Sequence, residues 1–239
     1  MTCKKRYHAP VSRLRILKEA EGVPLAAPDA TLVVHEIYAS LQGESTWSGL
    51  PCGFVRLSAC HLRCSWCDTP HAFDEGMRRT VEDVVSEAHA LGTHLVEVTG
   101  GEPLLQPGVY PLMTRLADLG HTVLLETSGS IDVSKVDPRV IKIVDVKCPG
   151  SGEVDSNRWE NLALLGPRDE IKFVLADRLD YEWARDTIRD RKLRNVLLSV
   201  AHGLLAPADV ARWMLEDRLD ARFQLQMHKV IWDPTARGV

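Results

Sequence analysis

Three cysteines, Cys60, Cys64 and Cys67, lie close together in the stretch SACHLRCSWCDT. Thiolates are soft ligands that suit zinc ions and iron–sulfur clusters. A structural zinc site takes four ligands, and His61 or His71 is near enough in sequence to supply the fourth. A [4Fe–4S] cluster could instead use three thiolates and leave its fourth iron open to a small molecule. The spacing favours the cluster over zinc.

The remaining cysteines, Cys3, Cys52 and Cys148, are scattered along the chain. Free cysteine usually behaves as a small, semi-buried hydrophobe. In a chain of this size without a secretion signal, a tight cysteine cluster indicates a metal or redox site rather than disulfides.

Short polar motifs follow the predicted strands. TGGEP, ETSGS, DVKCPGSG, SVAHG and QMHK all lie at or just after the carboxyl end of an apolar segment. Barrels and open α/β sheets place their binding sites at that end of the strands. The functional site is therefore expected at this edge, beside the cysteine loop.

Apolar segments and helical patterns alternate along the chain. Strands are predicted over residues 31–44, 52–59, 94–103, 121–130, 170–176, 195–203 and 222–231, with a strand and loop over 140–152. Helices are predicted over 81–91, 107–119, 180–192 and 207–218, and Thr80, Asp83 and Gly92 mark the ends of the first. This alternation predicts βαβ units in a parallel α/β sheet. With about six or seven strands, an incomplete TIM-like (β/α)6 barrel is expected.

The bulk properties describe an ordinary globular chain of 239 residues with a formal net charge of -4. That charge gives no sign of nucleic-acid binding. No apolar run reaches the roughly 18 residues of a membrane span, and the N-terminus has no signal-peptide core. We expect a cytoplasmic protein without membrane or nucleic-acid partners. Residues 1–30 are predicted to form an N-terminal extension, and residues 31–239 a single domain.

The motifs resemble those of radical S-adenosylmethionine (SAM) enzymes. Cys60, Cys64 and Cys67, with an aromatic residue before the last cysteine, match the cluster signature of these enzymes. The segment Thr99-Gly100-Gly101-Glu102-Pro103 matches their GGEP motif. The resemblance implies a partial barrel of the radical SAM type, one [4Fe–4S] cluster and SAM bound at the open iron.

A narrower resemblance is to the 7-carboxy-7-deazaguanine synthases. It rests on EIYASLQGES, FVRLSACHLRCSWCDT, ETSGS, DVKCPGSG, IKFVLADRLDYEWA and QMHK, which cover roughly residues 32–234 in order. Members of this family rearrange 6-carboxy-5,6,7,8-tetrahydropterin to 7-carboxy-7-deazaguanine with loss of ammonia, on the route to queuosine and other 7-deazapurines. The resemblance therefore implies a magnesium-dependent carbon–nitrogen lyase. It also implies a homodimer and an electron donor such as flavodoxin or ferredoxin.

The same resemblance implies roles for individual residues. Cys60, Cys64 and Cys67 would ligate the cluster. SAM would be bordered by Trp66, Cys67, Asp68, Gly101, Glu102, Ser128, Lys147, Cys148 and Pro149. The substrate would contact Leu41, Gln42, Gly43, Glu44, Arg56, Thr99, His228 and Pro234, and Thr69 would ligate Mg²⁺. The chemistry itself would be carried by the cluster and SAM, without a catalytic acid or base from the protein.

Several of these residues also have simpler interpretations. Arg56 can bind a carboxylate with two hydrogen bonds, and it interrupts the apolar run GFVRL, but it could be a surface arginine. Thr69 could cap a helix, and His228 could be a hydrogen-bonded core histidine. Ser128 and Lys147 could be solvated residues at strand ends. The chain also continues from Pro234 to Val239, beyond the point where its relatives end, which leaves the terminal substrate contact open.

Two other functions remain as alternatives. A radical SAM activase would share the cysteine spacing and abstract hydrogen from a glycine of a partner protein. A zinc-dependent binding module would use the same cysteines without catalysis. Gln42, Glu44 and Arg56 favour a small carboxylated heterocycle over a peptide.

Overall fold

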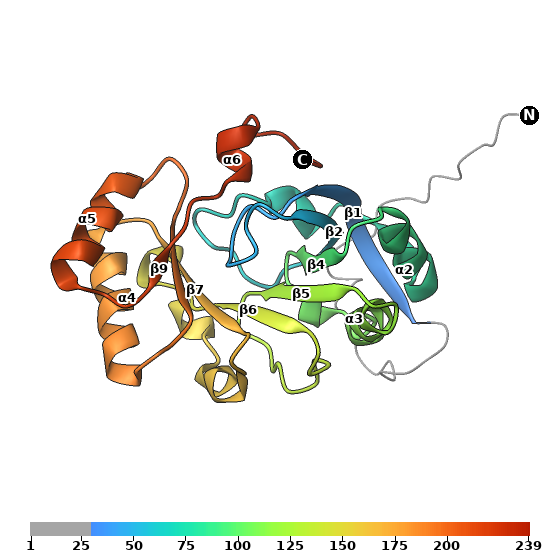
Figure 1. Ribbon diagram of the computed structural model, residues 1–239, viewed down its shortest axis with the longest axis horizontal. Helices are drawn as coiled ribbons and strands as arrows, with labels where there is room; N and C mark the ends of the chain where they lie inside the picture. Colours follow the sequence, from blue (N-terminus) through green and yellow to red (C-terminus); the bar gives the residue numbers. More distant parts are fainter. Residues whose placement is uncertain (1–29) are drawn as a thin grey trace, which may run out of the picture.

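The computed structural model describes residues 30–239, so the expected extension lies outside the described residues except for Ala30 (Figure 1). The centre of this part is one nine-stranded sheet with the order β3-β1-β2-β4-β5-β6-β7-β8-β9. The strands are β1 Thr31–Leu41, β2 Pro51–Leu57, β3 Met77–Thr80, β4 Leu95–Gly100, β5 Thr122–Thr127, β6 Ile141–Asp145, β7 Glu170–Leu175, β8 Val196–Val200 and β9 Arg222–Phe223. Strands β2 and β4 to β9 pair in parallel, whereas β1 is antiparallel to both β2 and β3. The expected incomplete barrel is confirmed, because the sheet ends at β3 and β9 and does not close.

Helices cover the outer face of the sheet at its two ends (Figure 1). They are α2 Val81–Ala90, α3 Val109–Asp118, α4 Arg178–Arg191 and α5 Pro207–Asp217, and a short helix, α6 His228–Ile231, follows the last strand. The predicted start of α2 is confirmed, since the Thr80 side chain accepts a hydrogen bond from the Asp83 amide at 3.1 Å.

Short 3₁₀ helices occupy several connections. They are η1 Pro70–Phe73, η2 Pro103–Leu105, η3 Pro149–Ser151, η4 Val154–Ser156 and η5 Trp159–Leu164. In the connection from β6 to β7, η3, η4 and η5 stand where a regular barrel would have an α-helix, and the connection from β5 to β6 contains neither an α-helix nor a 3₁₀ helix. None of the described helices is both long and apolar enough to span a membrane.

The two faces of the parallel strands differ in chemistry. The outward residues of β2, β4 and β5 pack under α2 and α3, and those of β7 and β8 pack under α4 and α5. The inward face is apolar near the amino ends of the strands, where Phe54, Leu124 and Ile143 pack together. Two residues further along the same strands, the inward positions become charged, at Arg56, Glu126 and Asp145. On these three strands the charged inward positions thus lie toward the carboxyl end of the barrel.

Two strand predictions were wrong in part. The predicted strand over 222–231 ends at Phe223, because the chain leaves the sheet and the Met227 amide donates to the Gly43 carbonyl at 2.8 Å. The predicted strand over 31–44 ends at Leu41, where a turn begins in which the Gln42 amide donates to the Leu50 carbonyl at 2.8 Å. Both departures bring polar residues over the carboxyl end of the barrel.

Candidate active site

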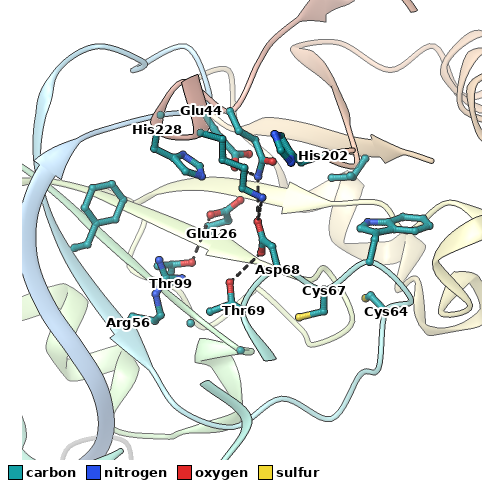
Figure 2. Close-up of a pocket in the computed structure, with 18 of the residues that line it drawn as sticks. Glu44, Arg56, Cys64, Cys67, Asp68, Thr69, Thr99, Glu126, His202 and His228 are labelled. Atoms are coloured by element: carbon teal, nitrogen blue, oxygen red, sulfur yellow. Dashed lines mark hydrogen bonds and ion pairs between the residues drawn. The ribbon is translucent and has the colours of Figure 1, made fainter. Parts of the chain in front are cut away.

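A cavity of about 610 Å³ opens at the carboxyl ends of the parallel strands. Most of the residues proposed from the sequence line it: Leu41, Gln42, Gly43, Glu44, Arg56, Cys60, Cys64, Trp66, Cys67, Asp68, Thr69, Thr99, Gly101, Ser128, Lys147, His228 and Pro234. They come from the β1–β2 turn, the cysteine loop, the ends of β2, β4, β5 and β6, and the C-terminal segment. Figure 2 shows Cys64, Cys67 and Thr69 on one side of this space, with Glu44 and His228 across from them. Chain folding therefore gathers motifs spread over about 190 residues at a single site.

Three of the proposed residues, Glu102, Cys148 and Pro149, do not line the cavity. The Glu102 carboxylate is fully buried and accepts hydrogen bonds from the Ser128 amide at 2.7 Å and the Ser128 hydroxyl at 2.5 Å. It also accepts from the Thr127 hydroxyl at 2.9 Å. Glu102 therefore supports Ser128 from behind, and Ser128 is not the solvated strand-end residue of the simpler interpretation.

The cysteine loop leaves the end of β2 through Ala59, whose φ of 74° lies in the left-handed region. The GGEP turn packs directly against this point. A Cβ atom on Gly101 would lie 2.3 Å from the Ala59 carbonyl oxygen and 2.8 Å from the Cys60 Cβ. Glycine is thus required here for contact between two segments of the protein, in addition to any approach by a ligand.

The three thiols differ from a zinc site in their spacing. Four-coordinate zinc with bonds of about 2.3 Å holds its sulfur ligands about 3.8 Å apart. Among the described residues, the only group of three histidine, cysteine or acidic side chains with ligand atoms all within 4.8 Å of one another is His35, Glu36 and His71. Neither the three cysteines together nor any pair of them with His61 or His71 meets this limit. Among the described residues, the cysteines are therefore not drawn together as the ligands of one zinc ion would be.

Burial keeps the bare thiols protonated. It raises the pKa of Cys60 to about 11 and also raises the pKa values of Cys64 and Cys67. Since a metal centre binds thiolates, its assembly must displace these protons. Lys147 is the nearby cation that favours the thiolate form of each cysteine.

A buried lysine that sequence reasoning missed organises the opposite wall. Lys172 Nζ on β7 lies 3.0 Å from Glu44 Oε2, pairs closely with Glu126, and lies 3.5 Å from Asp145. Burial opposes its charge, but the three carboxylates raise the pKa of Lys172. Burial also opposes ionisation of Glu44, yet Lys172 and the Gln226 amide lower the pKa of that carboxyl. Glu44 is therefore a charged acceptor at neutral pH.

The side chain of Gln42 is fully engaged within the protein. Its amide nitrogen donates to Glu97 at 2.6 Å, and its amide oxygen accepts from the Glu44 backbone at 2.5 Å. Burial and the charge of Glu126 raise the pKa of Glu97 well above its usual range. Gln42 therefore positions Glu44 rather than presenting a free amide to the cavity.

Arg56 is not a surface arginine. Its Nε donates to Glu36 at 2.8 Å and its Nη2 to the Tyr38 hydroxyl at 3.1 Å, and its side chain is only 18% exposed. Tyr38 and Glu36 lie on β1, opposite the β2 strand that carries Arg56. These contacts hold the guanidinium at the cavity wall, where it can receive a carboxylate.

Thr69 and Asp68 connect the cysteine loop with the C-terminal segment. The Thr69 hydroxyl makes no helix-cap bond and donates instead to Asp68 at 2.9 Å (Figure 2). Asp68 in turn accepts from Lys229 at 2.7 Å and from Gln226 at 3.2 Å. Burial opposes ionisation of Asp68, but Lys229 and the hydrogen bonds from Thr69 and Gln226 together lower the pKa of Asp68. The Thr69 side chain therefore does not cap a helix, contrary to the simpler interpretation.

The end of the chain forms part of the cavity wall. His228 lines the cavity, and burial lowers its pKa, so the imidazole is neutral. A Cβ atom on Gly43 would lie 2.4 Å from His228 Nδ1, so glycine permits this contact. Pro234 lines the cavity together with Arg237 and Val239, so the residues beyond Pro234 fold back over it.

Sequence reasoning missed Glu97, Glu126, Asp145 and Lys172, yet a signal was present. Each is a charged residue inside an apolar strand segment, as in VEV, LET, VDV and IKF. The argument that selected Arg56 applies equally to these four positions. Gln226 and Lys229 belong to the QMHK motif but were not singled out, because they lie within the segment 222–231 that was wrongly predicted to remain a strand.

Comparison with known proteins gives consistent similarities. Residues 55–148 match the model of the radical SAM superfamily. The chain is 49% identical over 224 residues to the 7-carboxy-7-deazaguanine synthase of Koribacter versatilis, with 86% of this chain and 99% of that protein covered. It is 45% identical over 217 residues to the synthase of Chlorobaculum tepidum, covering 88% and 99% respectively. Among solved structures, QueE from Escherichia coli matches with a TM-score of 0.66 and 24% identity over 83% of this chain and 95% of that one, a likeness of fold.

Proposed function

The chain belongs to the 7-carboxy-7-deazaguanine synthase family of radical SAM enzymes, and we propose that it converts 6-carboxy-5,6,7,8-tetrahydropterin to 7-carboxy-7-deazaguanine and ammonia. This reaction is a radical ring contraction in 7-deazapurine biosynthesis, the route to queuosine, and makes the enzyme a carbon–nitrogen lyase. The observation that carries the proposal is the identity of 49% across 99% of a synthase's length. Family membership also removes the alternatives of a glycine-directed activase and a zinc-binding module.

We assign the cluster and SAM to one side of the cavity. Cys60, Cys64 and Cys67 would hold a [4Fe–4S] cluster, which their soft sulfur ligands suit. SAM would lie against Trp66, Cys67, Asp68, Gly101, Ser128 and Lys147, with Glu102, Cys148 and Pro149 supporting that wall. When bound, the reduced cluster and SAM supply the 5′-deoxyadenosyl radical that removes hydrogen from C6 of the pterin.

We assign the substrate to the other side. Arg56 would bind its carboxylate, since Glu36 and Tyr38 hold the guanidinium in place and leave further N–H groups to donate. Glu44, kept ionised by Lys172, would accept the N–H donors of the guanidine-like edge. The remaining contacts would come from Leu41, Gln42, Gly43, Thr99, His228 and Pro234, with Gln42 acting through Glu44.

Thr69 is proposed as a ligand of Mg²⁺. The Thr69 hydroxyl and the neighbouring Asp68 carboxylate are hard oxygen donors at the cavity wall, as Mg²⁺ prefers. Bound there, Mg²⁺ would orient the substrate carboxylate and stabilise developing charge.

The protein's main contribution is to position the substrate and to exclude water. Asp68 ties the cysteine loop to the C-terminal segment through Lys229 and Gln226, which closes the cavity on that side. Lys172 and Glu97 fix Glu44 directly and through Gln42. Such fixed geometry places the pterin carbon next to the radical source and limits side reactions.

Further properties follow from the proposal. We propose a homodimer in the cytoplasm that receives electrons from a small donor such as flavodoxin or ferredoxin. We propose no nucleic-acid or membrane partner. Residues 31–239 would form one radical SAM domain, preceded by an extension.

The test is an anaerobic assay of the reconstituted enzyme with 6-carboxytetrahydropterin, dithionite and SAM, followed by chromatography and mass spectrometry. The expected product is 7-carboxy-7-deazaguanine. SAM should be regenerated, so the product should exceed SAM when SAM is limiting. SAM cleavage without the deazaguanine would refute the assigned substrate.

A further inference from the structure

We propose that His35, Glu36 and His71 form a binding site for a zinc-like divalent cation at the wall of the cavity, separate from the Mg²⁺ site proposed at Thr69. The inference rests on the geometry of these three residues and does not depend on the proposed reaction. One candidate ligand atom from each residue lies within 4.8 Å of the other two. Within residues 30–239, no other three histidine, cysteine or acidic side chains converge in this way.

A β-bulge brings two neighbouring residues of β1 to the same site. Val34 pairs with Leu57 on β2 and Glu36 pairs with Arg56, so His35 is an extra residue without a partner in the ladder. In a regular strand, successive side chains point to opposite faces, and His35 and Glu36 would diverge. Bulges re-aim side chains in this manner and are frequent beside active sites.

The third residue comes from a different part of the chain. His71 lies in η1, after the cysteine loop, and its ring centroid is 4.8 Å from that of His35. All three residues are partly buried, so they are shielded from bulk solvent and are still accessible to an ion. Glu36 and His71 line the cavity, whereas His35 does not.

Hydrogen bonds to neighbouring groups orient two of the proposed ligands. His35 Nδ1 lies 3.4 Å from the Glu75 carbonyl oxygen, a contact that places the proton on Nδ1 and leaves Nε2 as the donor to a metal. Arg56 binds Glu36 through Oε1 at 2.8 Å, which leaves Oε2 for a cation. Metal ligands in proteins are commonly held by such contacts, a carbonyl for histidine and a hydrogen-bond donor for a carboxylate.

The charges around the site are close to balance. Arg56, which pairs with Glu36, and Arg237 are the nearby positive charges that oppose binding of a cation. Glu36 carries the opposing charge within the site, and Glu75 pairs with Arg237 at 3.5 Å. The negative charge of Glu36, and the neutralisation of Arg237 by Glu75, therefore allow a divalent ion to bind here.

The ligand set selects the kind of ion. Two imidazoles and one carboxylate suit zinc, cobalt or nickel, whereas Mg²⁺ prefers oxygen ligands alone. Three protein ligands leave at least one coordination position open. Because Glu36 and His71 line the cavity, that position faces the cavity beside Arg56, where a carboxylate ligand of the cavity could complete the coordination.

The proposal can be tested on the reconstituted holoenzyme, in which the cluster occupies the cysteines. The protein is dialysed against a Zn²⁺ series in excess Mg²⁺, and zinc and iron are measured by mass spectrometry. The wild type should bind one zinc per chain. His35→Asn and His71→Asn should each weaken that binding by at least about 10-fold, the lower limit for losing a group that merely orients a ligand.

His121→Asn is the matched control, because His121 is a partly buried histidine at the other end of the barrel that contacts His89 and the Thr93 carbonyl. It should leave the zinc affinity unchanged. Iron content and circular dichroism establish that each variant is folded and loaded. Zinc X-ray absorption should show imidazole and oxygen neighbours. The proposal is overturned by wild-type protein that binds no zinc, by equal affinities in all variants, or by sulfur around the zinc.

Discussion

Replacing Lys172 with methionine is expected to destabilise the protein by about 3 kcal/mol at pH 7. Methionine is unbranched and one atom shorter than lysine, so it keeps most of the side chain's length but removes its charge. The lysine side chain is 6% exposed and is the cation shared by Glu44 at 3.0 Å, Asp145 at 3.5 Å and Glu126. Removing one partner of a buried ion pair costs about 3–5 kcal/mol. The lower value applies, because Lys147 still compensates Asp145 at 2.6 Å.

The loss of stability caused by Lys172→Met should become smaller as the pH falls. In the wild type, the pKa values of Glu44 and Asp145 are lowered, since lysine pairing outweighs burial. Their contribution to stability is present above their unfolded pKa values, about 4.3 and 3.9, and is lost as pH falls through the lower folded values. Without Lys172, burial raises the pKa of Glu44. As the pH falls, Glu44 takes up a proton and the variant no longer contains this unpaired buried charge. The difference in stability should therefore shrink from pH 8 to pH 5.

Thermal unfolding followed by circular dichroism under anaerobic conditions measures this effect. For a chain of this size, about 3 kcal/mol corresponds to a fall in Tm of roughly 6–12 °C. Arg115→Met is the control, because it breaks an exposed pair with Glu82, with side chains 48% and 62% exposed, and should shift Tm little. A fall no larger than that of the control, or a deficit that does not change with pH, would refute the reasoning.

Four further outcomes are expected. Cys64→Ala should abolish SAM cleavage, measured as 5′-deoxyadenosine, while circular dichroism remains that of a folded barrel; retained cleavage would contradict the cluster assignment. Arg56→Ala should weaken substrate affinity far more than SAM affinity in equilibrium binding, and equal losses would count against its carboxylate role. Removal of Mg²⁺ should slow turnover, and Thr69→Ala should raise the Mg²⁺ concentration required; turnover indifferent to both would leave Thr69 as a partner of Asp68 alone. Because burial raises the pKa of Glu97, its contribution to stability falls as pH rises. Glu97→Gln should therefore gain in Tm relative to the wild type between pH 5 and 8, and a constant difference would argue against a protonated Glu97.

The part of the fold that could be predicted from the sequence is the part encoded by local patterns. The order of strands and helices and the open barrel follow from local patterns such as the Thr80 cap and the apolar runs. The last strand was not predictable in the same way. Residues 224–231 are apolar enough for a strand, but Met227 bonds to Gly43, and no local pattern encodes that contact. The edge strand β3 was also missed, because it is short and polar and exists only through its pairing with β1.

By itself, the sequence determined the cysteine loop, the strand-end motifs and hence the candidate site, because these ligands are neighbours along the chain and their spacing is set by covalent connection. The tertiary structure decided which of these side chains are available to a ligand and which are bonded to other protein groups. It commits the Gln42 amide to Glu97 and places Lys172 against Glu44, 128 residues away in sequence. It also aims His35 at His71 through a bulge in β1. These contacts depend on strand register and on the path of the C-terminal segment, which arise only when distant parts of the chain pack together.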